Sequence, residues 1–172
     1  EAPSAWITRW AHLVPAGGTV LDVACGMGRH TRHFHASNHP VASVDSSQTA
    51  IDSVATIAEA VCADIEAGPW PFAGREFAGV VVTNYLWRPL LPTLVQSVAP
   101  GGVLLYETFS AGNETVGKPS RPDFLLQPGE LLRACSALRV VAFDDGFVDH
   151  PPRFVQRMAA VRDASRSEPP RP

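Results

Sequence analysis

Apolar runs and helix-like stretches alternate along nearly the whole chain. Runs typical of strands lie at residues 19–25, 40–45, 59–65, 77–86, 101–109, 138–148 and 153–162. Stretches typical of helices lie at residues 8–14, 29–37, 46–58, 88–102 and 128–136, and Ser46 is a candidate N-cap for the third of them. The runs are apolar without strict alternation, which predicts strands that are covered on both faces of a sheet.

This alternation predicts the α/β class. We expect a Rossmann-like, doubly wound, seven-stranded sheet that is mostly parallel, in a three-layer α/β/α arrangement. No helix separates the last two strands, so they should form a terminal antiparallel hairpin. We expect a single domain over residues 1–162 and a disordered tail over residues 163–172, which are charged and rich in proline. Residues 110–127 are expected to form a long loop, either a lid or a solvated linker.

The first strand ends in a turn of small residues, and this turn is the strongest candidate for a ligand site. Asp22 is followed by Ala24, Gly26 and Gly28, and then by a helix start. Small residues allow a tight turn and a close approach of the backbone to a ligand. This spacing alone also fits a nicotinamide dinucleotide. A carboxylate at Asp22 would repel a diphosphate and attract an ammonium group, which favours S-adenosylmethionine as the cofactor.

Two further carboxylates follow later strands. Asp45 ends the second strand, about 20 residues after the turn, where a carboxylate can accept hydrogen bonds from both ribose hydroxyls. Asp64 ends the third strand beside Ile65, and the pair can offer an acceptor to an adenine amino group and an apolar face to its ring.

In this order, the segments "LDVACGMGRHT", "VASVDSS", "CADIE", "FAGVVVTNYLWRPLL" and "PGGVLLYETF" resemble the class I S-adenosylmethionine-dependent methyltransferases. The later stretch "YETFSAGNETVGKPSRPDFLLQPGELL" is similar to the bacterial branch of tellurite-resistance methyltransferases. The resemblance covers about nine-tenths of the chain. It implies a methyl transferase that uses S-adenosylmethionine and releases S-adenosylhomocysteine.

The resemblance also implies roles for individual residues. The methionine and ribose parts of the cofactor would be lined by Asp22, Ala24, Cys25, Gly26 and Gly28. The ribose and adenine would be held by Asp45, Ser46, Asp64 and Ile65, and the transferring methyl would lie near Asn84 and Tyr85. Ala24 replaces the usual first glycine of the pattern, which costs little if its φ is negative. The string "NYLW" departs from the Asn-Pro-Pro-aromatic motif of amino-group DNA methyltransferases, which disfavours that activity.

Several other polar residues are weaker candidates. Glu107 ends the fifth strand and is a candidate base or acceptor-positioning group, or else a structural glutamate. Trp87 and Arg88 follow the fourth strand and could contact the acceptor, or pack under the loop. The histidines between His30 and His39 lack a matching acidic or cysteine ligand, so we predict no metal site and place them on a solvent face.

Composition narrows the partners. The net charge of −3 does not favour nucleic-acid binding, and no apolar run approaches the roughly 20 residues of a membrane helix. The first residues lack a signal-peptide pattern and the three cysteines are far apart, so we expect a reduced, cytoplasmic protein. We predict a small-molecule or metalloid acceptor. The alternatives are an RNA or protein methyltransferase, a silent S-adenosylmethionine-binding module and a nicotinamide-dependent oxidoreductase; the oligomeric state is left open.

Overall fold

The computed structural model describes residues 1–164 and 169–172, and this part of the chain contains a seven-stranded sheet. The strands are β1 Val20–Val23, β2 Val41–Asp45, β3 Glu59–Cys62, β4 Phe77–Thr83, β5 Val98–Phe109, β6 Arg139–Asp149 and β7 Pro152–Val161. The α-helices are α1 Ala5–Trp10, α2 Arg29–Ala36, α3 Gln48–Val54, α4 Leu91–Gln96 and α5 Glu130–Ala134. Short 3₁₀ helices cover Ala11–Leu13, Arg88–Leu90, Asn113–Thr115 and Pro122–Phe124.

The strand order is β3-β2-β1-β4-β5-β7-β6. The first five strands of this order pair in parallel, whereas β7 is antiparallel to both β5 and β6. The predicted fold class is therefore confirmed, including the terminal hairpin. Because β1 lies between β2 and β4, the chain reverses its direction of travel across the sheet at β1, and ligands of such sheets bind at the carboxyl ends beside this point.

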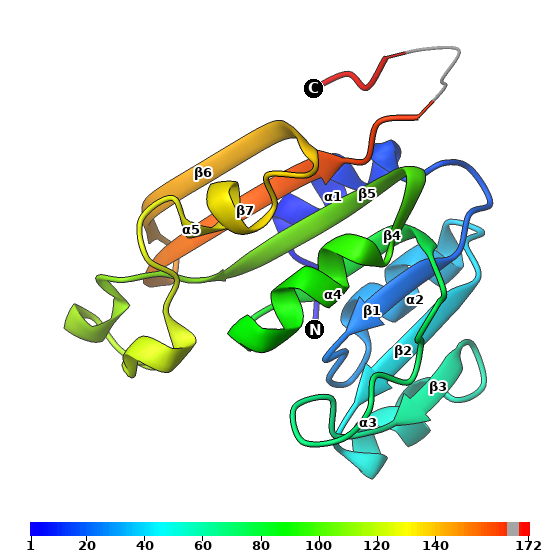
Figure 1. The fold of residues 1–172 in the computed structure, drawn as a ribbon. Coiled ribbons are helices and arrows are strands. Elements are labelled where there is room, and N and C mark those ends of the chain that lie inside the picture. The colour runs from blue at the N-terminus through cyan, green and yellow to red at the C-terminus, as the bar shows by residue number, and fades with distance from the viewer. Residues whose placement is uncertain (165–168) are drawn as a thin grey trace.

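Helices cover both faces of the sheet, as Figure 1 shows, with α4 and α5 in front of it and α1 behind it. On the α1 face, Trp6, Ile7 and Trp10 pack with Phe34 of α2 against apolar residues of the central strands. On the opposite face, the apolar residues of α4 and α5 pack in a second cluster that includes Leu104 and Tyr106 of β5. These two cores are the outer interfaces of the expected three layers.

Some element boundaries differ from the sequence prediction. Helix α3 begins at Gln48 and its N-cap is Ser47, whose Oγ accepts a hydrogen bond from the Ala50 amide at 3.2 Å. Ser46 is therefore not the N-cap, because the hydroxyl of Ser47 accepts the hydrogen bond from the first-turn amide of Ala50. Helix α3 also stops well before the predicted end at residue 58.

The predicted disorder of residues 163–172 stays a prediction, since residues 165–168 lie outside the described part of the chain. Before them, the Asp163 carboxylate pairs with Arg139 at 2.9 Å. After them, the carbonyl of Arg171 lies 3.3 Å from His12 Nε2. In the described ranges, no helix has the length and apolar character needed to cross a membrane.

Gly28 is the N-cap of α2, at the end of the turn after β1, and it packs closely against Val54 of α3. Its φ is +86°, and a Cβ built on it would lie 2.2 Å from Cγ1 of Val54. We expect Gly28→Ala to lower the free energy of unfolding by about 2–4 kcal/mol, from left-handed backbone strain and overpacking. Denaturant unfolding of a double-mutant cycle with Val54→Ala should show a favourable coupling of about 1 kcal/mol or more. Additive effects would mean that the two residues do not contact each other.

Candidate functional site

The turn after β1 is built from backbone in the left-handed region. The φ angles of Ala24, Gly26 and Gly28 are +52°, +54° and +86°. The Gly26 amide donates to Asp45 Oδ2 at 2.9 Å, so the end of β2 fixes the turn. The expectation of a negative φ at Ala24 is wrong, because the chain must reverse direction there. An alanine in this region costs about 1–2 kcal/mol, and such strain is concentrated at functional sites.

The carboxylates at the ends of β2 and β3 both bind backbone amides. The two oxygens of Asp45 accept from the amides of Gly26 and Ser47, and each keeps a lone pair for a further donor. Oδ1 of Asp64 accepts from the amides of Glu66 and Ala67, which lowers the pKa of this exposed carboxyl. Each carboxylate therefore retains acceptor capacity at the carboxyl edge of the sheet. For Ser46 and Ile65, the predicted adenine contacts stay predictions.

Asp22 is buried between β1 and α2, whereas the sequence predicted that it would contact the cofactor. Its side chain is 2% exposed and its Oδ2 accepts from Thr31 Oγ1 at 2.7 Å, inside the interface between β1 and α2. Burial raises the pKa of this carboxyl to about 7. Asp22, like Asp45 and Asp64, is absent from the residues that line the cavity described next, and its predicted cofactor contact stays a prediction. An electrostatic preference for an ammonium group over a diphosphate cannot rest on a buried, partly protonated carboxyl.

A cavity of about 300 Å³ lies at the carboxyl ends of β1 and β4. It is lined by Glu1, Ala24, Cys25, Gly26, Met27, Arg29, Arg32, Thr83 and Asn84. A Cβ on Gly26 would meet no atom within 4 Å, so the turn leaves open space there. We call this space the cofactor cavity. Burial and the nearby Asp22 and Asp45 raise the pKa of the Cys25 thiol to about 12, so it is not a thiolate nucleophile.

A second cavity of about 450 Å³ shares Asn84 with the first. It is lined by Glu66, Asn84, Tyr85, Leu86, Thr108, Phe109, Pro119 and Phe124, and we call it the acceptor cavity. The φ of Asn84 is +53°, a second left-handed position opposite the turn after β1. Its amide donates to the Glu107 carbonyl at 2.9 Å, and no hydrogen bond of its side chain is found within residues 1–164 and 169–172. Asn84 therefore belongs to the lining of both cavities, and its predicted place near the transferring methyl stays a prediction.

Tyr85 enters the acceptor cavity as a hydrogen-bond donor. Its hydroxyl donates to Glu66 Oε2 at 2.9 Å, and its carbonyl accepts from the hydroxyl of buried Tyr106 at 2.8 Å. Burial raises the pKa of Tyr85 well above its ordinary value of 10, and the hydrogen bond to Glu66 adds to the shift. Tyr85 therefore stays protonated and is suited to position groups rather than to accept a proton.

Glu107, the predicted base, faces the opposite side of the sheet. Its side chain accepts from Ser4 Oγ at 2.8 Å and from Arg157 Nε at 2.6 Å, and the residue is 6% exposed. Successive residues of a strand point to opposite faces, so Thr108 lines the acceptor cavity and Glu107 does not. A catalytic contact by Glu107 is therefore not supported. It anchors the N-terminal segment instead.

The histidines that precede β2 differ in exposure, so the expected solvent face is wrong for two of them. His30 is 2% exposed, its Nε2 accepts from the Ser4 amide at 2.9 Å, and burial lowers its pKa to about 4. His39 is buried, with Nδ1 2.8 Å from the Gly18 carbonyl. Within the described residues, no group of three or more His, Cys, Asp or Glu could hold a metal ion.

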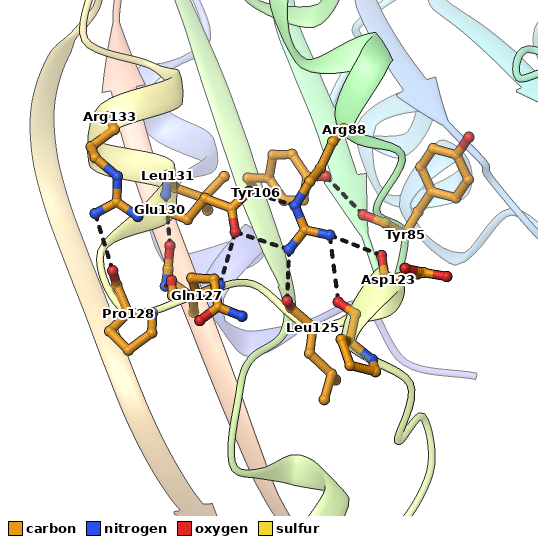
Figure 2. A network of polar contacts seen from close by, with 12 residues as sticks. Tyr85, Arg88, Tyr106, Asp123, Leu125, Gln127, Pro128, Glu130, Leu131 and Arg133 are labelled. Carbon is orange, nitrogen blue, oxygen red and sulfur yellow. Dashed lines mark hydrogen bonds and ion pairs between the residues drawn. The ribbon is translucent and has the colours of Figure 1, made fainter.

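Arg88 fastens the loop that closes the acceptor cavity. Its guanidinium donates to both carboxylate oxygens of Glu130, at 2.8 and 3.0 Å, and to the Leu125 carbonyl at 2.8 Å. It also reaches the carbonyls of Pro122 and Asp123, so one side chain joins the 3₁₀ turn of the loop to the start of α5 (Figure 2). The guanidinium is thus occupied within the fold, which disfavours its predicted acceptor contact. Trp87 is likewise absent from the lining of the acceptor cavity.

Sequence reasoning missed part of both linings. In the cofactor cavity these residues are Glu1, Met27, Arg29, Arg32 and Thr83, and in the acceptor cavity they are Glu66, Leu86, Thr108, Phe109 and Pro119. A usable signal existed for Met27 and Arg29, because Met27 lies within the glycine turn and Arg29 directly follows it. A further cavity of about 460 Å³ lies between residues 70–76 and α4, near the amino ends of β4 and β5, away from the site.

Residues 20–102 match the family described as "Methyltransferase domain". These residues run from β1 to the start of β5 and include the left-handed turns that flank the cofactor cavity. The chain carries a methyltransferase domain. The match agrees with the predicted resemblance to S-adenosylmethionine-dependent methyltransferases and supports S-adenosylmethionine as the cofactor. No curated protein matches the sequence.

Solved structures of methyltransferases share the fold. TehB from Haemophilus influenzae is similar with a TM-score of 0.73 at 17% identity, over 92% of this chain and 61% of that one. The chain therefore spans less than two thirds of that protein. A SAM-dependent methyltransferase from Methanosarcina mazei gives 0.72 at 12% identity, over 96% of this chain and 100% of that one. The N-methyltransferase NodS from Bradyrhizobium japonicum gives 0.68 at 15% identity, over 91% and 94%.

Asp22 makes a pH-dependent contribution to stability. Its pKa is about 7 in the folded protein and close to the ordinary 3.8 in the unfolded chain. Between these values the folded state holds the extra proton, so stability falls as pH rises and the full cost is present above pH 7. Asp22→Asn should remove this slope and stabilise the protein at pH 8 by a few kcal/mol, at about 1.4 kcal/mol per pKa unit. Denaturant unfolding at pH 5 and pH 8 measures this, with exposed Asp149→Asn as control. A parallel pH profile for Asp22→Asn and wild type would refute it.

Arg88→Gln should release the loop. The variant loses the paired hydrogen bonds to Glu130 and the contacts to the loop carbonyls, so hydrogen exchange should accelerate at residues 119–126. We expect a stability loss of about 1–3 kcal/mol. Arg121→Gln is the matched control, because Arg121 pairs with Asp123 and lies over the Phe124 ring at the surface, where the side chains of Arg121 and Asp123 are both 72% exposed. Equal exchange in the two variants would show that Arg88 does not fasten the loop.

Proposed function

We propose that this protein transfers the methyl group of S-adenosylmethionine to a small-molecule or metalloid acceptor by in-line displacement. The proposal rests on the two cavities that meet at Asn84 within and beside the matched methyltransferase domain. The glycine turn lines one cavity, Tyr85 and the loop residues Pro119 and Phe124 line the other, and Asn84 lines both. This arrangement suits a donor and an acceptor that approach each other along one line.

The residues of the cofactor cavity fit S-adenosylmethionine. The open space beside Gly26 accepts a ligand close to the backbone, and the Arg29 guanidinium suits a carboxylate. Asp45 keeps acceptor lone pairs that suit ribose hydroxyls. When bound, the cofactor supplies a methyl group already activated on a sulfonium. The protein then has to hold, align and shield the two reactants.

The acceptor side contributes positioning. Asn84 and Tyr85 present an amide and a protonated hydroxyl to the acceptor cavity, and neither suits proton abstraction from the acceptor. A soft or already deprotonated acceptor atom needs no such base. The apolar part of the wall, formed by Leu86, Phe109, Pro119 and Phe124, suits the carbon skeleton of a small molecule. The size of the cavity, about 450 Å³, is that of a small-molecule site.

We place this activity in the cytoplasm. The cysteines Cys25, Cys62 and Cys135 are all free thiols, which suits a reducing compartment.

Gly26 provides the test of the cofactor cavity. Gly26→Ala adds a methyl group to the open space beside the turn and should weaken S-adenosylmethionine binding, measured by calorimetry, at least tenfold. Gly17→Ala is the matched control, since Gly17 also has a positive φ, +72°, and open space around its Cβ. Both variants should lose about 1–2 kcal/mol of stability to backbone strain. Unchanged affinity in Gly26→Ala, or equal losses in both variants, would contradict the proposed site.

A further inference from the structure

The charge on the wall of the acceptor cavity is negative. Of the described residues that line it, the only one with a charged side chain is Glu66, and no Lys, Arg or His is among them. The other polar groups are the amide of Asn84 and the hydroxyls of Tyr85 and Thr108. An oxyanion in this cavity would lose part of its hydration without gaining a cationic partner, which disfavours its binding.

The nearby cations do not offset this charge. The guanidinium of Arg88 is paired with Glu130 and with loop carbonyls, and Arg121 is paired with Asp123. Lys118 precedes Pro119 in the chain, but its side chain is exposed and its Nζ lies 3.4 Å from Ser120 Oγ. A negative acceptor therefore finds no free cation on the cavity wall.

Glu66 is held toward an incoming group by one hydrogen bond. The Tyr85 hydroxyl donates to Oε2, and within residues 1–164 and 169–172 the other oxygen, Oε1, has no hydrogen-bond partner. A carboxylate oriented in this way can bind an ammonium group through its free oxygen. The apolar part of the wall is formed by Leu86, Phe109, Pro119 and Phe124, and the aromatic faces of the two phenylalanines also attract cations.

We propose that the acceptor cavity binds a small apolar amine in its cationic form, with Glu66 as the counter-ion, Tyr85 as the residue that positions Glu66 and the aromatic wall around its carbon skeleton. This inference rests on the proposed function and narrows its acceptor to amines, away from metalloid oxyanions. The bound ammonium ion has no lone pair, so its proton passes to the Glu66 carboxylate before the free nitrogen can attack the methyl group. It concerns recognition by the chain's own residues, so it is measured without the cofactor.

The test uses three probes that share one skeleton: phenethylamine, 2-phenylethanol and phenylacetate, together with tellurite as a metalloid oxyanion. Calorimetry at neutral pH, where an alkyl amine is protonated, should give the tightest binding for phenethylamine. Glu66→Gln should weaken phenethylamine binding about threefold to tenfold and leave 2-phenylethanol unchanged. Tyr85→Phe should give a smaller loss, and Lys118→Ala should give none.

Each outcome decides the inference. Tighter binding of phenylacetate or tellurite than of phenethylamine, or unchanged amine affinity in Glu66→Gln, would overturn it. S-adenosylmethionine affinity is measured on the same samples. If the wild-type protein does not bind S-adenosylmethionine, the proposed function is wrong. If it binds S-adenosylmethionine but shows no preference for the amine, only the proposed class of acceptor is wrong.

Discussion

The site depends on the parallel pairing of β1 with β4. Val23 lies opposite Val82, so β1 and β4 end side by side at the same edge of the sheet. The backbone turns directly after each strand. Each turn uses left-handed backbone, at Ala24 and Gly26 after β1 and at Asn84 after β4. A regular strand or helix at either position would fill the space between them. The cofactor cavity is thus the space left by two strained turns, and the hydrogen bond from Gly26 to Asp45 holds one of them in place.

Because side chains alternate along β5, its polar residues Glu107 and Thr108 face opposite sides of the sheet and make different contacts. Glu107 and Arg157 form a buried ion pair on the α1 face, where Ser4 joins them and His30 accepts from the Ser4 amide. This cluster ties the N-terminal segment to the sheet, and Glu1 thereby reaches the cofactor cavity. Thr108, one residue further along, serves the other face. Removing either partner of a buried pair is costly, so the cluster is structural rather than reactive.

Much of the fold, and less of the site, could be predicted from the sequence. Apolar runs that end at glycine and proline predict strands and helices, because turn formation depends on residues that are close in the sequence. These runs located each of the seven strands of the described sheet. The exposure of Asp22, Glu107 and His30 could not be read in this way, because it depends on which face of a strand or helix meets a neighbour distant in sequence. The lining from Pro119 to Phe124 depends on how a long loop folds back, which the carbonyl contacts of Arg88 decide.

The anchoring of that loop bears on how an acceptor is selected. A free lid would lose conformational entropy on closing, and part of the binding energy would offset that loss. Arg88, Glu130 and the backbone bonds between Ala111 and Leu126 already hold the loop in place, as the network of Figure 2 illustrates for Arg88. A wall fixed in advance cannot adapt its charge or shape to each ligand. Selectivity must then come from what the wall already presents, which is an apolar, aromatic surface with a single carboxylate.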